Sequence, residues 1–169
     1  MNERDRAEFT EFVSGRSGAL MRLAYALTAD QHAAEDLLQT ALMKAAARWR
    51  RIHTAPEAYV RQIMYHEQVS RWRRRARHRE TVMADPPDRP EAPVTSPEAR
   101  LDLQQALRAL PAGKRAVLVL RYLEDLPEAQ VADLLGCSVG TVRSQAHKAV
   151  TQLRAALAPA ELTSIEVEP

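Results

Sequence analysis

The stretch EAQVADLLGCSVGTVRSQ, residues 128–145, decides the fold of the C-terminal part of the chain. Three apolar residues fall where the two helices of a helix-turn-helix motif touch each other: Val131, Leu135 and Val142. Ala132 supplies the small side chain that a close helix crossing requires, and Gly136 tolerates the positive φ of a tight turn. Ser138 is placed to cap the second helix. The segment therefore predicts a helix-turn-helix.

The second helix of this motif would present a polar face suited to the major groove of DNA. Its candidate contacts to bases and phosphates are Thr141, Arg143, Ser144, Gln145 and Lys148. A plain helical hairpin with a polar outer face is the alternative. Upstream of the motif, apolar spacing predicts helices over about 99–109 and 112–123, separated at Pro111.

Prolines and acidic residues crowd the middle of the chain. Five of the ten prolines lie within twelve residues there, and the longer stretch from Glu80 to Ala99 contains five acidic residues and one arginine. Proline removes a backbone donor and pushes the preceding residue toward extended conformations. We therefore expect a flexible linker at 81–99. It would separate a unit at 1–80 from a unit at 100–158, with a disordered tail at 159–169.

The N-terminal unit has the pattern of three or four packed helices. Apolar residues recur at helical spacing from Leu20 to Leu27 and stop near Thr28. A stronger amphipathic pattern covers 32–50, and Pro56 marks the start of a further helix. We expect an all-α fold with two small helical domains.

Positive charge is concentrated between residues 44 and 79, where eleven lysines and arginines face two glutamates. Six of them stand in RWRRRARHR, residues 71–79. Such a cluster repels itself unless an anion neutralises it, and nearby aromatic rings can stack on unpaired bases. A solvated helix end is the alternative. Trp49 and Trp72 fall on apolar stripes, so we expect them in the core.

No catalytic constellation is apparent. His66-Glu67 begins like the H-E-x-x-H zinc motif, but the second ligand position holds Ser70, which cannot replace an imidazole. Glu35 and Asp36 are adjacent, and on a helix they point about 100° apart. We expect a protein that is not an enzyme and binds no cofactor or metal. A hydrolase that uses His66 and Glu67 is the weaker alternative.

The compartment is predicted from two further features. The single cysteine, Cys137, cannot form an internal disulfide, which fits a reducing environment. The N-terminus lacks the apolar segment of a signal peptide, and no stretch approaches the roughly 20 apolar residues of a membrane span. We expect a cytoplasmic protein.

Residues 7–79 and 100–158 together resemble a known family, the extracytoplasmic-function (ECF) group of the sigma-70 family of bacterial RNA polymerase sigma factors, which contain only regions two and four. The motifs that carry the resemblance are AEDLLQ at 34–39, YVRQI at 59–63, WRRR at 72–75 and GCSVGTVRS at 136–144. The resemblance implies a protein that binds promoter DNA and core RNA polymerase, through the β′ clamp coiled coil and the β flap. It also implies an anti-sigma factor as a further partner and a place with the polymerase on the nucleoid.

The resemblance also implies a role for individual residues. The implied polymerase contacts are Asp36, Gln39 and Thr40. The implied contacts to minus-ten DNA are Arg51, His53, Tyr59, Arg61, Gln62, Tyr65, His66, Arg73 and Arg74. The implied contacts to the minus-thirty-five element are the polar residues 141–148 named above. His66 and Ser70 stand where the family commonly has asparagine and aspartate. A stand-alone helix-turn-helix regulator is the alternative function.

Overall fold

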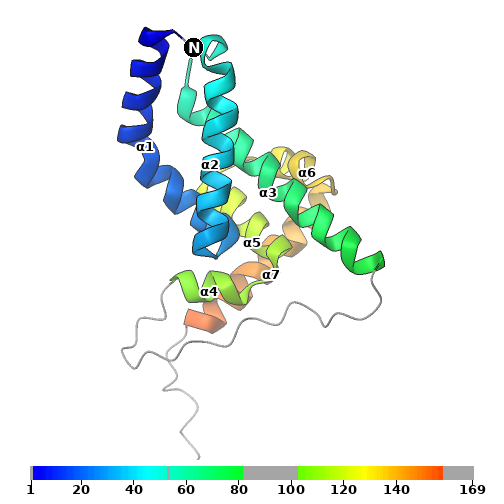
Figure 1. Ribbon diagram of the computed structural model, residues 1–169. Helices are drawn as coiled ribbons and strands as arrows, with labels where there is room; N and C mark the ends of the chain where they lie inside the picture. The colour runs from blue at the N-terminus through cyan, green and yellow to red at the C-terminus, as the bar shows by residue number, and fades with distance from the viewer. Residues whose placement is uncertain (1, 53, 82–102, 158–169) are drawn as a thin grey trace, which may run out of the picture.

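The computed structural model describes residues 2–52, 54–81 and 103–157, and these are helical with short connections (Figure 1). The elements in chain order are α1 (Glu3–Thr28), α2 (Gln31–Arg48), the 3₁₀ turn η1 (Trp49–Arg51), α3 (Pro56–Thr81), α4 (Leu103–Ala109), α5 (Ala112–Leu118), the π-helical turn η2 (Val119–Leu123), α6 (Glu128–Leu135) and α7 (Val139–Leu157). No strand occurs in the described ranges, which confirms the all-α prediction. The predicted linker beyond Thr81 and the predicted tail lie outside these ranges.

The first two helices form a hairpin whose ends are fixed by polar side chains. Asn2 and Asp5 make a reciprocal capping box at the start of α1. Ala29 closes α1 in the left-handed conformation, with a φ of 55°. Asp30 then caps α2, because its Oδ1 accepts from the backbone N of Ala33 at 2.8 Å. This two-residue connection brings α1 and α2 side by side (Figure 1).

The N-terminal bundle is completed by α3, which packs its apolar stripe against the hairpin. The fully buried side chains of this core include Leu20, Leu27, Leu37, Val60 and Met64. At the far end of the bundle, the ring of Trp49 meets Phe9 edge-on at 5.0 Å and lies 5.3 Å from the ring of Phe12. Trp49 is half-buried and packs on these two rings outside the main core, so the prediction that it belongs to the core is wrong. The helices predicted around residues 20–27, at 32–50 and from Pro56 are confirmed, although α1 begins much earlier than its apolar pattern indicated.

The helix-turn-helix is formed by α6 and α7. Gly136 has a φ of 64°, its backbone N donates to Asp133 O, and the backbone N of Cys137 donates to Ala132 O at 3.1 Å. This pattern is a Schellman motif. Ser138 Oγ then accepts from the backbone N of Thr141 at 3.1 Å, which confirms the predicted cap. The three predicted apolar contact residues are all buried, so the motif is confirmed.

The two halves of the chain pack together in one structure. A single apolar cluster continues from the α1–α3 bundle into α4–α7, and α3 runs alongside α5 and α6 (Figure 1). At the contact, the ring of Trp72 covers Gly113 so closely that a Cβ on Gly113 would lie 3.1 Å from Trp72 Cζ2. Trp72 is therefore packed as predicted, but against the other half of the chain. The contact between the halves was not predicted.

Replacing Leu37 by alanine will destabilise the bundle. The side chain is fully buried between α1 and α3, so its loss leaves a cavity and lowers the free energy of unfolding by about 2–5 kcal/mol. Met43, on the same helix, is 67% exposed, and Met43→Ala is expected to change stability by less than about 0.5 kcal/mol. Urea unfolding followed by circular dichroism measures both, and equal effects would contradict this packing.

Candidate functional site

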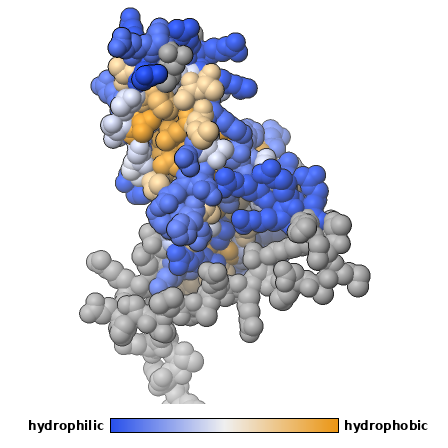
Figure 2. All heavy atoms as spheres, in the orientation of Figure 1, coloured by the Kyte–Doolittle hydropathy of each residue, from blue (hydrophilic) through white to orange (hydrophobic). Residues whose placement is uncertain are grey.

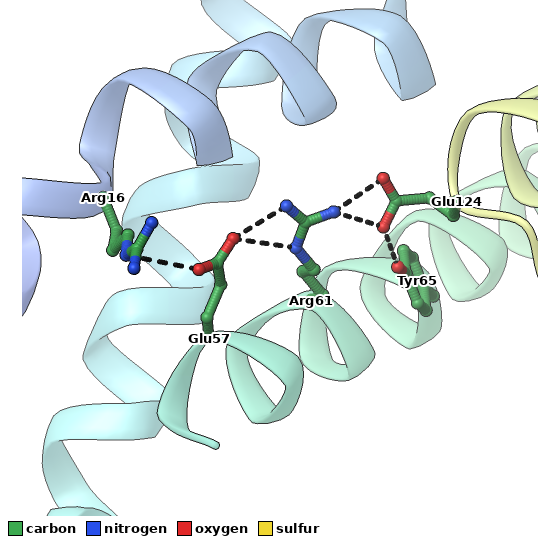
Figure 3. A network of polar contacts seen from close by, with 5 residues as sticks. All are labelled: Arg16, Glu57, Arg61, Tyr65 and Glu124. Atoms are coloured by element: carbon green, nitrogen blue, oxygen red, sulfur yellow. Dashed lines mark hydrogen bonds and ion pairs between the residues drawn. The ribbon is translucent and has the colours of Figure 1, made fainter.

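A chain of charged groups lines the inner face of α3 (Figure 3). Glu57 contacts Arg16 Nε at 3.3 Å and accepts from Arg61 Nη2 at 2.7 Å. Arg61 Nη1 in turn donates to both carboxylate oxygens of Glu124 at 2.7 Å. The hydroxyl of Tyr65 donates to Glu124 Oε2. Four of these residues belong to the N-terminal bundle, and Glu124 comes from the other half of the chain.

Burial and pairing shift the proton affinities within this network. Burial raises the pKa of Tyr65, and its hydrogen bond to the Glu124 carboxylate raises it further. Burial alone would lower the pKa of Arg61, but its hydrogen bonds to Glu124 and Glu57 raise it above its ordinary value. The phenol is therefore held neutral and the guanidinium charged, the states in which both donate to Glu124.

The outer face of α2 combines exposed polar groups with an apolar groove. Asp36 and Gln39 are exposed and lie three residues apart, so they share one face of the helix. Thr40 is half-buried, and its Oγ1 accepts from Arg71 Nη2 at 3.5 Å. An open groove of about 420 Å³ runs beside Gln39 between α1 and α2. Its lining is mostly apolar: Phe9, Met21, Glu35, Leu38, Gln39, Leu42, Met43 and Ala46. Figure 2 shows the corresponding apolar patch in its upper half.

The first turns of α7 present the predicted groove-reading residues. Thr141, Arg143, Ser144 and Lys148 are exposed, whereas Gln145 is half-buried beside a cleft between the halves. Arg143 Nε contacts Glu128 Oε2 at 2.7 Å, and both side chains lie at the surface of the motif. Ser138 caps the first turn of α7, and Thr141, like Gln145, lines the cleft that α3 borders.

Two family models match the chain on either side of the predicted linker. The model of sigma-70 region 2 matches residues 13–78, and the model of sigma-70 region 4 matches residues 100–153. An RNA polymerase sigma-E factor of Streptomyces coelicolor is 37% identical over 165 residues, covering 95% of this chain and 92% of the relative. The chain belongs to the sigma-70 family. The ECF resemblance predicted from the sequence is thereby confirmed.

Two further proteins place this sigma factor within the family. An ECF RNA polymerase sigma factor, SigE of Mycolicibacterium smegmatis, is 35% identical over 156 residues, which cover 88% of this chain and 61% of the relative. The solved structure of the sigma factor RpoE, in complex with the anti-sigma factor NepR from Bartonella quintana, superposes with a TM-score of 0.58. That pair shares 26% identity and covers 89% of this chain and 96% of the other.

The residues implied for minus-ten DNA in this sigma factor separate into two groups. His66, Arg51 and Arg74 are exposed, and Tyr59 and Gln62 are half-buried, while His53 lies outside the described residues. The remaining three are engaged by the other half of the chain: Arg61, Tyr65 and Arg73. Arg73 is exposed but donates through Nη2 to the backbone oxygen of Leu134 at 3.2 Å. Tyr65 is only 3% exposed.

Glu124 is the one member of this network from region four, and sequence analysis did not identify it. It precedes the polar turn at Asp125 and is not part of an apolar repeat, so its sequence context is that of an ordinary exposed acidic residue. Only the packing of the two halves places it on α3. Within the described ranges, His, Cys, Asp and Glu side chains nowhere gather in threes that could hold a metal ion. Every helix in those ranges is too short or too polar to cross a lipid bilayer.

Alkaline pH will weaken the folded state through Tyr65. Because its pKa is raised on folding, its contribution to stability is fully present below the ordinary tyrosine pKa of about 10 and is lost as the pH rises through the higher folded value. Urea unfolding of the protein and of Tyr65→Phe between pH 8 and 12 tests this. The variant is expected to lose less stability above pH 10, and two parallel pH profiles would contradict it.

Proposed function

We propose that this sigma factor joins core RNA polymerase and directs it to promoters whose minus-thirty-five duplex is bound by α7 and whose melted minus-ten strand is bound by α3. The observation that carries the proposal is the presence of both sigma regions on one chain, each with exposed polar residues at its family positions. We assign region two to residues 1–80, the linker to 81–99 and region four to 100–158.

The dimensions and chemistry of α7 support duplex reading. An α-helix with its side chains is about 10–12 Å wide, close to the roughly 12 Å width of the major groove. Arg143 carries a planar pair of donors that matches the O6 and N7 acceptors of guanine. Thr141 and Ser144 offer hydroxyls to bases or phosphates, and Lys148 offers a charge to the backbone. In the free protein Arg143 is paired with Glu128, so on binding DNA a base or phosphate acceptor would replace the Glu128 carboxylate.

The charge of α3 supports binding of an unwound strand. The segment from Arg71 to Arg77 places arginines around the helix, with Arg73, Arg74 and Arg75 all exposed. Each phosphate that they neutralise releases counterions and favours binding. Unstacking a base costs a few kcal/mol. Several such contacts are enough to offset that cost.

The face around Asp36 and Gln39 supports docking to the polymerase, with the β′ clamp coiled coil as the partner on region two and the β flap as the partner of region four. An apolar groove beside polar side chains is the usual make-up of a protein interface, where the apolar part contributes area and the polar part specificity. The proposal assigns the protein no catalytic step of its own. It also places the protein in the cytoplasm, on the nucleoid, where both partners lie, and allows an anti-sigma factor as a third partner.

Run-off transcription with core polymerase on a cognate promoter tests the function. The double variant Asp36→Ala with Gln39→Ala is expected to bind core polymerase more than tenfold more weakly and to lose transcription, because central interface residues dominate affinity. Glu11→Ala removes an exposed acid of α1 and serves as the control. Duplex binding without any association with core enzyme would instead favour a stand-alone helix-turn-helix regulator.

Base reading by α7 is tested with Arg143→Ala and Lys148→Ala in the holoenzyme. Arg143→Ala is expected to remove about 1–3 kcal/mol of discrimination at one base pair of the minus-thirty-five element. Lys148→Ala is expected to weaken all sequences equally and to reduce the slope of affinity against salt by about one. Selection of bound promoter variants measures both. Uniform loss in the Arg143 variant would show that Arg143 contacts only the backbone.

A further inference from the structure

Region four covers part of the face through which α3 is proposed to bind the minus-ten strand. Glu124 occupies Arg61 and Tyr65, and the backbone oxygen of Leu134 occupies Arg73. All three side chains belong to the residues that the family resemblance assigns to minus-ten DNA. The face that would bind a strand is therefore already bound, by the other half of the same chain.

The position of Glu124 is fixed by the turn that follows η2. The backbone N of Glu124 donates to Val119 O at 3.0 Å, and that of Leu126 donates to Leu120 O at 2.9 Å. Asp125, between them, has a φ of 51°, and the guanidinium of Arg121 donates to Leu126 O. This turn holds the Glu124 carboxylate against α3, and only 5% of the side chain remains exposed.

The donors that Glu124 uses are those that a DNA phosphate would need. Arg61 Nη1 donates to both Glu124 oxygens, while Nε and Nη2 donate to Glu57. Nearly every donor of the guanidinium is therefore occupied. Guanidinium groups bind carboxylates and phosphates in the same two-pronged geometry. A strand phosphate can reach Arg61 Nη1 only if the Glu124 carboxylate leaves it.

Other contacts between the halves are present in the same closed arrangement. Arg108 Nε donates to Ala29 O at 2.9 Å, and Arg115 Nε donates to Leu27 O at 3.3 Å. Both oxygens lie at the C-terminal end of α1, where positive charge is favoured by the helix dipole. These donors bond to backbone carbonyls, and the ring of Trp72 packs on Gly113. Glu124, in contrast, carries a negative charge across the contact onto the minus-ten face.

We propose that Glu124 is an internal competitor for promoter DNA, which holds region four closed over the minus-ten face of α3 until a strand phosphate or the polymerase displaces it. The competition rests on the proposed function, because it needs α3 to bind a strand. The closure itself does not, because it concerns only contacts within the free chain.

Two variants at neighbouring positions each remove one negative charge. They separate the specific contact of Glu124 with α3 from a general effect of charge. Glu124→Gln keeps the shape but removes the ion pair with Arg61 and leaves one acceptor oxygen in place of two. Asp125→Asn, the control, lies on the exposed side of the same turn, and asparagine tolerates its positive φ. The bond from Tyr65 becomes neutral and about half as strong, and the ion pair with Arg61 is lost, so we expect Glu124→Gln to raise the open-to-closed ratio by about tenfold.

Closure is measured on the free protein without DNA or polymerase. In a Trp49→Phe background the remaining tryptophan, Trp72, reports on its contact with Gly113, and small-angle scattering reports the radius of gyration. Glu124→Gln is expected to shift the Trp72 emission to the red and to expand the chain, while Asp125→Asn resembles the parent. Tyr65→Phe removes the hydrogen bond from the α3 side and is expected to act in the same direction. Unchanged emission and size in Glu124→Gln, with the fold retained by circular dichroism, overturn the proposal.

Competition is measured by the affinity of the free protein for single-stranded minus-ten DNA. Glu124→Gln is expected to bind about tenfold more tightly than the parent and than Asp125→Asn. Opening without a gain in affinity overturns the role as competitor, and so does the absence of strand binding by every variant. The proposed function fails separately, if core polymerase with the parent protein gives no promoter-directed transcript. The Trp72 and scattering results then still decide whether Glu124 closes the chain.

Discussion

The structure depends on α3, which packs against the hairpin on one side and against region four on the other. One side of this helix buries Val60 and Met64 against the α1–α2 hairpin and so completes the N-terminal bundle. The other side carries Arg61 and Tyr65 toward region four. When region four moves away, α3 stays packed on the hairpin and its Arg61 and Tyr65 side is uncovered. The relation between the two halves is therefore set along α3, and any change in it alters the charged groups presented there.

Electrostatics makes the contact between the halves selective. A carboxylate that is almost fully buried is costly unless donors surround it, and Glu124 meets that condition with one guanidinium and one phenol. The Arg61 side chain is 30% exposed, so water screens part of its attraction. The contact is thus specific in geometry but moderate in strength. That combination suits an arrangement that must hold in the free protein and give way to a polyanion.

The sequence predicted most of the local structure and little of the assembly. The helix-turn-helix was predictable because Gly136 and Ser138 have local conformational signatures, and the α2 and α3 segments because their apolar residues repeat at helical spacing. The first half of α1 was missed because it has few apolar residues and packs mainly through Phe9 and Phe12 at the bundle end. The contact between regions was missed because long-range pairing of Arg61 with Glu124 leaves no periodic signal in either segment.

The π-helical geometry of η2 has an evolutionary consequence. A π turn contains one more residue than the α turn that would otherwise occupy its place. Deleting one residue between Val119 and Leu123 would convert this turn to α-helical geometry and remove the hydrogen bond from Glu124 N to Val119 O. The position of Glu124 against α3 would then change, while the α6–α7 motif kept its own internal hydrogen bonds. Relatives that differ by one residue in the length of this turn are therefore expected to differ in how their minus-ten face is covered. In some, region four of the same chain covers it, and in others a separate protein must do so.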